Sequence, residues 1–156
     1  MFHFEEGEVF LVEKPLDWTS FDVVNLIRSV IKRFHGIRKL KVGHAGTLDP
    51  LATGLLIICT GRMTKQIDNF QAQEKVYTGT MLLGQTTPTF DMESEADAFY
   101  STDDITIDMM EDARISFIGD IMQRPPKFSA IKINGKRDFD YARSDEEVAL
   151  KERLVH

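Results

Sequence analysis

Gly43-His44-Ala45-Gly46-Thr47-Leu48-Asp49-Pro50-Leu51-Ala52-Thr53-Gly54 is the stretch around which the sequence is organised, and it leads directly into the apolar run Leu55-Leu56-Ile57-Ile58-Cys59. An apolar run bounded by turn residues predicts a buried strand. A glycine-rich loop before such a strand can hold a polar side chain at the edge of a core, and here that side chain is Asp49. Pro50 biases Asp49 towards an extended backbone. Because Asp-Pro in a loop is also a common turn, two interpretations stay open, a turn-former and a reactive carboxylate.

The size and composition fit one globular domain. The chain has 156 residues, of which 42% are hydrophobic, so a sizeable core can form. Cys59 is the single cysteine, which excludes an internal disulfide and fits a reducing compartment. The amino terminus lacks a basic start followed by an apolar run, and no stretch has the length of a membrane span. We therefore expect a cytoplasmic protein.

The charges are segregated along the chain. The net charge is −6, which by itself argues against a nucleic-acid binder. However, residues 23–48 contain no acid, and residues 91–112 contain no base. The basic side chains of the first segment are Arg28, Lys32, Arg33, Arg38, Lys39 and Lys41. A local basic surface can attract a polyanion despite a negative total, whereas the acidic segment is interpreted as a solvated face.

Helical and alternating patterns predict the elements of the first half. We expect strands at residues 8–13, 55–60 and 74–84, and a short helix at residues 64–70. A longer helix is predicted over residues 21–34, capped by Thr19 or Ser20 and ended by Gly36. Its expected apolar stripe consists of Phe21, Val24, Ile27, Ile31 and Phe34.

The second half is predicted to be less regular. Residues 85–100 are expected to form a loop, and Thr106 to cap a helix over residues 107–118 whose core stripe is Met109, Met110, Ala113 and Phe117. A short strand is predicted at residues 119–122, a helical turn at 139–143 and a strand from Val148. Asn134-Gly135 predicts a hairpin between residues 129–133 and 136–138. Hairpins with separate helices indicate an α+β fold with a largely antiparallel or mixed sheet.

Five sequence blocks resemble those of a known family. The central stretch is similar to the G-H-x-G-x-L-D-P-x-A-x-G loop of the TruB family of tRNA pseudouridine synthases. The further matching blocks, in the family's order, are residues 12–15, 75–77, 83–91 and 125–132. Five blocks in the right order are a specific signal. The resemblance implies the N-terminal portion of a pseudouridine synthase catalytic domain over residues 1–156, with a thumb-like hairpin at about 123–147.

The resemblance implies an RNA-modifying isomerase that acts on uridine 55 in the T-arm of tRNA. Asp49 would be the catalytic nucleophile. Tyr77 would stack on the flipped uracil, and His44 would fill the space that the uridine leaves. The alternatives are a core tyrosine on an alternating strand and a loop histidine bonded to the backbone. The isomerisation demands neither a cofactor nor a metal, and the histidines show no ligand spacing.

Other residues are expected to support the site or bind the RNA backbone. By the resemblance, Lys14 falls where the family has a lysine that lines the site, and Lys14, Gly46 and Thr47 are interpreted as structural support for the site. The expected phosphate contacts are Arg38, Lys39, Lys41, Lys127, Lys132 and Lys136. Cys59 is expected to be inert core.

Members of the family continue beyond the length of this chain. Their further segment supplies an arginine that pairs with the catalytic aspartate and a second pocket tyrosine, and an RNA-binding domain often follows. We therefore keep a second hypothesis, a non-catalytic RNA-binding fragment of the same fold. A sheet edge left unpaired could also permit self-association.

Overall fold

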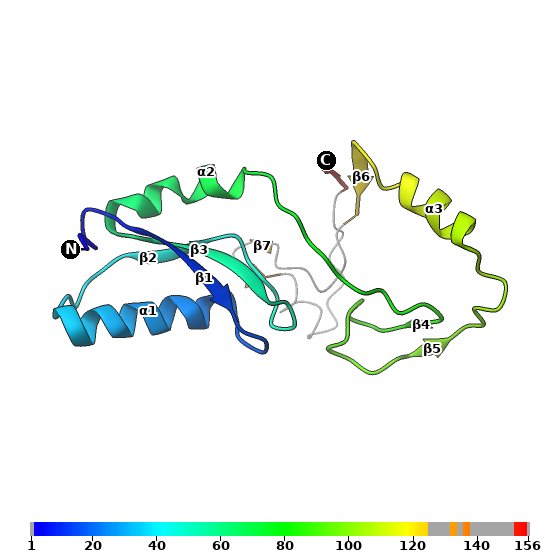
Figure 1. Ribbon diagram of the computed structural model, residues 1–156, viewed down its shortest axis with the longest axis horizontal. Coiled ribbons are helices and arrows are strands. Elements are labelled where there is room, and N and C mark those ends of the chain that lie inside the picture. Colours follow the sequence, from blue (N-terminus) through cyan, green and yellow to red (C-terminus); the bar gives the residue numbers. More distant parts are fainter. Residues whose placement is uncertain (1, 125–131, 134–135, 138–151, 156) are drawn as a thin grey trace. The chain divides into compact units, whose positions relative to one another are not determined.

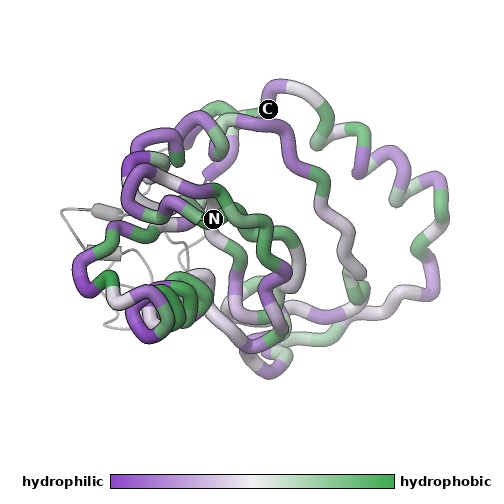
Figure 2. Tube along the Cα trace, turned by 60° about the vertical axis from the view of Figure 1, so that its left-hand side comes forward, coloured by the Kyte–Doolittle hydropathy of each residue, from purple (hydrophilic) through white to green (hydrophobic). Residues whose placement is uncertain are grey.

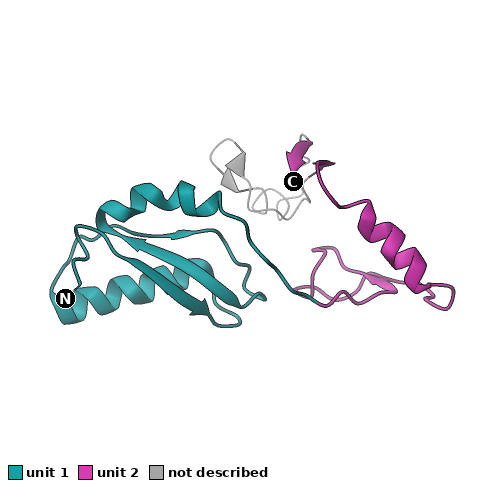
Figure 3. Cartoon of the chain, turned by 45° about the horizontal axis from the view of Figure 1, so that its top comes forward, with its two compact units in different colours: residues 1–79 teal, residues 80–156 magenta. Residues whose placement is uncertain are grey.

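The computed structural model describes residues 2–124, 132–133, 136–137 and 152–155, with only the backbone described at 132–133 and 136–137. The chain divides into two units, Met1–Gly79 and Thr80–His156, which Figure 3 colours separately. The architecture is α+β with small antiparallel sheets, as the sequence predicts.

The first unit is built on a three-stranded antiparallel sheet with the order β1-β3-β2. Its strands are β1 (Val9–Lys14), β2 (Val42–Ala45) and β3 (Gly54–Thr60). The apolar run after the central loop is therefore the middle strand, and the prediction of a buried central strand is confirmed. Figures 1 and 3 show this sheet between helix α1 (Ser20–His35) and the pair formed by the 3-10 helix η1 (Gly61–Gln66) and α2 (Ile67–Gln71).

Helix α1 begins and ends at the residues that the sequence indicates. Thr19 is the N-cap and forms a capping box with Asp22, because each side chain accepts from the other's backbone N–H. The hydrogen bonds from the Thr19 hydroxyl and backbone lower the pKa of Asp22. Gly36 ends the helix in a left-handed conformation with φ 70°, and its N–H donates to the Lys32 carbonyl.

The buried face of α1 differs from the predicted stripe. Figure 2 shows the hydrophobic residues of this helix gathered on one side. The buried apolar residues are Val23, Val24 and Ile31, which pack with Leu56 and Ile58 of β3 into one core. Phe21 and Phe34 are exposed instead, and each carries an arginine guanidinium over its ring. The covered face starts at Ser20 rather than at Phe21, because Ser20, Val23 and Val24 are buried at the start of the helix.

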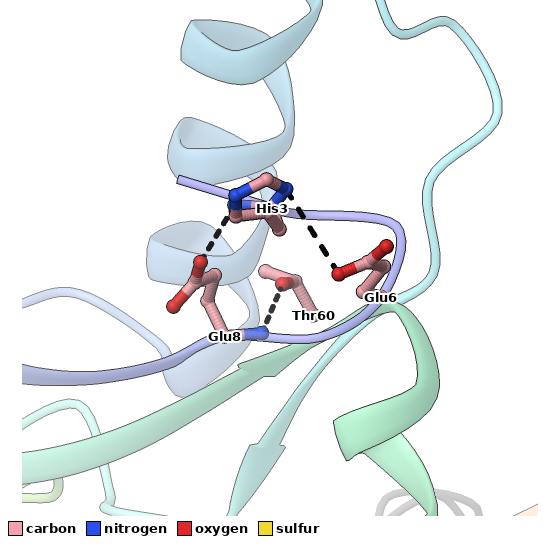
Figure 4. A network of polar contacts seen from close by, with 4 residues as sticks. All are labelled: His3, Glu6, Glu8 and Thr60. Carbon is pink, nitrogen blue, oxygen red and sulfur yellow. Dashed lines mark hydrogen bonds and ion pairs between the residues drawn. The ribbon is translucent and has the colours of Figure 1, made fainter. Parts of the chain in front are cut away.

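The N-terminal segment is tied to the end of β3 by the polar contacts drawn in Figure 4. The backbone N–H of Glu8 donates to the Thr60 hydroxyl over 3.0 Å, and the backbone N–H of Thr60 donates to the Glu8 carbonyl over 2.9 Å. The backbone N–H of His3 donates to the Glu8 carboxylate over 2.6 Å. These bonds bring the first residues against Gly61, where η1 begins.

Gly61 is predicted to be intolerant of a side chain. Its φ is +51°, and a Cβ built there would lie 2.2 Å from the Glu5 carbonyl oxygen. We expect Gly61→Ala to lower the free energy of unfolding by about 3 kcal/mol, through left-handed strain and overpacking together. Denaturant melts of both proteins measure this. Gly36→Ala is the matched control, because its φ is +70° but nothing lies within 4 Å of the built Cβ. Equal losses in the two variants would contradict the role given to the close approach.

The predicted strand over residues 74–84 is wrong. Residues 74–83 have no regular structure, and their apolar side chains are open to solvent, with Val76 87% and Met81 84% exposed. The alternation of the sequence is real, but a strand forms only with a hydrogen-bonding partner, and the described part of the chain offers none here.

The second unit contains short elements. The strand pairs are β4 (Gln85–Thr86) with β5 (Ala98–Phe99), β6 (Ile121–Gln123) with β9 (Arg153–Val155), and β7 (Lys132–Ile133) with β8 (Lys136–Arg137). The β7–β8 pairing confirms the predicted hairpin at residues 132–133 and 136–137, whereas the remainder of its two arms, Asn134-Gly135 and the turn at 139–143 lie outside the described residues. Of the strand predicted from Val148, β9 confirms the part at Arg153–Val155, whereas residues 148–151 lie outside the described residues.

Helix α3 (Ile107–Ile115) is capped by Thr106 as predicted, but its predicted core stripe is wrong. Met109, Met110 and Phe117 are 55%, 44% and 73% exposed, and α3 contains no buried residue. Periodicity identifies an apolar face but does not supply the surface that covers it. In the described part of the chain, no helix is long and apolar enough to cross a membrane.

Candidate functional site

Asp49 lies in the connection between β2 and β3, which we call the Asp49 loop (residues 46–53). Gly46 and Gly54, at its two ends, have φ values of +106° and +128°, which favour glycine. The loop closes with a turn in which the Ala52 N–H donates to the Asp49 carbonyl over 3.0 Å. The Asp49 side chain is exposed and makes no hydrogen bond or ion pair with another described residue. Its carboxylate is therefore open to a ligand.

Lys14 is fully buried at the end of β1. Its side chain binds the backbone of the Asp49 loop at Pro50. Its ammonium donates to three backbone carbonyls, those of Pro15 at 3.0 Å, Trp18 at 2.5 Å and Pro50 at 3.3 Å. A buried ammonium has three protons to place, and all three have acceptors here. Lys14 thus joins the turn after β1 to the residue that follows Asp49.

His44 and its neighbours lie at the start of the same loop. His44 is half-buried in β2, and its Nδ1–H donates to the Gly46 carbonyl, so Nε2 is the ring nitrogen that remains without a partner in the described part of the chain. This is the loop histidine bonded to the backbone that the sequence left as an alternative. Thr47 is exposed, and its side chain makes no hydrogen bond to a described residue.

Tyr77 is not brought into this cluster. It lies in the irregular segment after α2 and is 70% exposed. No hydrogen bond or ring contact joins its side chain to another residue that the structure describes. The alternative of a core tyrosine on a strand is therefore wrong, and the stacking role stays a prediction.

A basic hollow lies between η1 and the segment that precedes β2. The sequence predicted only some of its basic residues. Its volume is about 290 Å³, and it is lined by Glu5, Lys39, Leu40, Lys41, Gly61, Arg62, Thr64 and Lys65. Arg62 and Lys65 were missed, although the absence of any acid from residue 61 to 67 was a signal for them. Four cations face one carboxylate there, which is an arrangement suited to a polyanion.

The other basic residues singled out in the sequence have different environments. Arg38 lines a second hollow of about 480 Å³ with Ser29, Lys32, Arg33 and Gly36. Arg28 belongs to the basic segment but was not an expected phosphate contact, and it donates to the Val42 carbonyl over 3.2 Å, which joins α1 to β2. Lys127 lies outside the described residues, and of Lys132 and Lys136 only the backbone, in β7 and β8, is described.

The structure describes no candidate metal centre. Within residues 2–124 and 152–155, no three histidine, cysteine or acidic side chains are grouped so that they could hold an ion. Cys59 is fully buried, and burial raises the pKa of its thiol, which is the environment of an unreactive core cysteine.

Comparison with known proteins places the chain in a family. Residues 32–156 match the family described as TruB family pseudouridylate synthase (N terminal domain). The chain is 57% identical to the tRNA pseudouridine synthase B of Phocaeicola vulgatus over 98% of its length, and 54% identical to that of Parabacteroides distasonis over 97%. It is 50% identical to that of Chlorobaculum tepidum over 96%.

The relatives are longer than this chain, which spans 65% of the length of the first two and 60% of the third. The family match nevertheless covers most of the chain, including His44, the Asp49 loop, and Lys39 and Lys41 of the basic hollow. The chain belongs to the TruB family of pseudouridylate synthases.

Proposed function

We propose that this chain forms the N-terminal part of an enzyme that isomerises uridine to pseudouridine in tRNA, at uridine 55 of the T-arm. The observation that carries the proposal is the exposed Asp49 carboxylate on an anchored loop, in a chain 57% identical to a tRNA pseudouridine synthase B. The fold expected for the whole enzyme is that of a pseudouridine synthase catalytic domain, and its location the cytoplasm, where tRNA is found.

The reaction requires few catalytic groups from the protein. The C1′–N1 glycosidic bond breaks, the uracil turns, and C5 forms the new bond to C1′. The C5 proton then leaves to solvent, and N1 takes up a proton, so the numbers of atoms in substrate and product are equal. No electron is gained or lost overall. Asp49 serves as the nucleophile, as a carboxylate does in retaining glycosidases. The attacked atom, on the sugar or on the ring, is left open.

Recognition of the uridine is assigned to aromatic and loop side chains. Tyr77, with an exposed ring, supplies a stacking face for the flipped base, a contact of about 1–3 kcal/mol in other systems. His44 lies at the start of the Asp49 loop with its Nδ1–H engaged with Gly46, so Nε2 is the ring nitrogen left for a nucleotide. That nitrogen can form a hydrogen bond with a nucleotide when the histidine enters the RNA loop.

The tRNA backbone is proposed to lie over the basic hollow. Lys39 and Lys41 approach it from the segment before β2, and Arg62 and Lys65 from η1. Phosphate contacts of this kind hold the register without reading the sequence. The proposal thus accounts for RNA binding by a chain of net charge −6.

Charge reversal at Lys39 and Lys41 is expected to weaken tRNA binding by about tenfold to a hundredfold at low salt. It should also reduce the slope of log Kd against log salt by about 2, one for each lost phosphate contact. Filter binding between about 50 mM and 200 mM salt measures both quantities. The control is Arg114→Glu with a second reversal at Arg124, which changes the total charge equally in the second unit. Unchanged affinity in the Lys39/Lys41 variant would show that the face is wrongly assigned.

The function itself is tested with an extended enzyme, in which this chain is continued by the C-terminal third of the Phocaeicola vulgatus relative. Incubation with a T-arm stem-loop RNA should produce pseudouridine at position 55, detected by carbodiimide labelling and primer extension. The relative's own enzyme is the positive control. An extended enzyme that folds, binds the RNA and yields no pseudouridine would refute the proposed reaction and favour the RNA-binding fragment.

A further inference from the structure

Ser20 is a buried hydroxyl at the start of α1 that the proposed function leaves unused. Its side chain is 2% exposed, and it is the first residue of the helix. The capping of α1 does not require it, because Thr19 and Asp22 form the capping box. A buried hydroxyl needs hydrogen-bond partners, so its partners indicate its role.

Both partners of Ser20 belong to one residue of the Asp49 loop. The Ser20 hydroxyl donates to the Leu48 carbonyl over 3.1 Å, and the Leu48 N–H donates to the same hydroxyl oxygen over 2.9 Å. One side chain thereby satisfies both polar groups of the backbone residue directly before Asp49. The two residues are 28 positions apart in the sequence, so the contact is tertiary.

The residue directly after Asp49 is held from the same segment. The Pro50 carbonyl accepts from the Asp17 N–H over 2.9 Å and from the Lys14 ammonium over 3.3 Å. Asp49 is thus fixed on both sides through its backbone neighbours. Its carboxylate has no partner among the described residues, so the backbone alone determines where it points.

We infer that Ser20 is a positioning residue for Asp49, an inference that rests on the proposed function. Loss of its hydroxyl leaves the Leu48 N–H and carbonyl unpaired beside a methyl group, and the loop must move to reach water. A displacement of about 1 Å at a reacting group can cost about a hundredfold in rate. Substrate affinity depends on other residues, so the chemical step carries the loss.

The test compares Ser20→Ala with two variants of the extended enzyme. We expect Ser20→Ala to lower kcat by about tenfold to a hundredfold, with the Kd for the stem-loop RNA changed less than about twofold. Ser20→Thr keeps the hydroxyl and should recover most of kcat. Asp22→Ala is the matched control, because it removes half of the capping box next to Ser20 without touching Leu48. It should lower Tm and leave kcat within about twofold.

A second readout is independent of activity. Hydrogen exchange of the Leu48 amide should be at least about tenfold faster in Ser20→Ala than in the parent, and unchanged in Asp22→Ala. Parental kcat and parental exchange in Ser20→Ala would overturn the inference, as would equal losses of kcat in the two alanine variants. If Ser20→Ala does not fold, Ser20→Cys, which has a weaker donor and acceptor, carries the same comparison. If the extended enzyme with Ser20 intact is inactive, the proposed function is refuted. The exchange rates would still decide whether Ser20 holds Leu48 in solution.

Discussion

Asp49→Asn in the extended enzyme is expected to abolish pseudouridine formation while the RNA remains bound. The amide has nearly the shape of the carboxylate, and the Asp49 side chain makes no contact with a described residue that its replacement could disturb. The loop should therefore keep its conformation, held through Leu48 and Pro50. What is lost is the negative charge and the nucleophilic oxygen, and removal of a covalent catalyst typically costs about 10⁴-fold or more.

Tritium release from RNA that carries 5-tritiated uridine measures the loss, because the C5 proton leaves as the new bond forms. Filter binding gives the Kd, which should remain within about threefold of the parent since the phosphate contacts are unchanged. Glu13→Gln is a suitable control, because it removes an exposed carboxylate on β1. Release at the parental rate in Asp49→Asn would falsify the assignment of the nucleophile.

Residues 1–156 alone are expected to turn over at least about 10³-fold more slowly than the extended enzyme. A carboxylate acts as a nucleophile most effectively in a site that excludes water and supplies fixed polar partners. In the described part of this chain Asp49 is exposed and makes no ion pair, and Tyr77 is 70% exposed. The arginine that the resemblance pairs with the catalytic aspartate has no counterpart that can be named in this sequence.

The comparison uses equal concentrations of the two proteins and one stem-loop RNA, with single-turnover rates from carbodiimide labelling. RNA binding by the shorter chain is expected to persist, because the basic hollow is formed entirely by residues between Glu5 and Lys65. Binding without turnover would support both the assignment of the hollow and the need for further residues. Equal rates would show that Asp49 needs no partner from outside the chain.

The sequence predicted those elements whose signals are local. Thr19 and Gly36 marked the ends of α1, and the run after Gly54 marked the central strand, because capping and turn chemistry depend on adjacent residues. The predictions of a strand at residues 74–84 and of a core stripe on α3 were wrong for the same reason. Their patterns were read correctly as apolar faces, but burial depends on a partner surface, which a pattern does not contain.

The candidate site was predicted as a set of residues and not as an arrangement. The position of Asp49 could be inferred from the motif, and Lys14 was expected as a support. The contacts through which Ser20 and Lys14 anchor the loop could not be inferred. These contacts join residues 28 and 36 positions apart and exist only because β1 and β3 pair with Lys14 opposite Gly54. Likewise, Arg62 and Lys65 join Lys39 and Lys41 only after β2 and β3 have formed.

The uncovered segment at residues 76–83 also bears on how this polypeptide behaves in concentrated solution. Its eight residues, Val-Tyr-Thr-Gly-Thr-Met-Leu-Leu, contain no charge and no proline, and Val76, Tyr77 and Met81 are at least 70% exposed. Uncharged stretches of about six or seven residues with high β-propensity are those that stack into cross-β fibrils. In cells that make only these 156 residues, we expect chaperones and proteases to recognise the same stretch, so that the abundance of the polypeptide is set by their capacity as well as by its rate of synthesis.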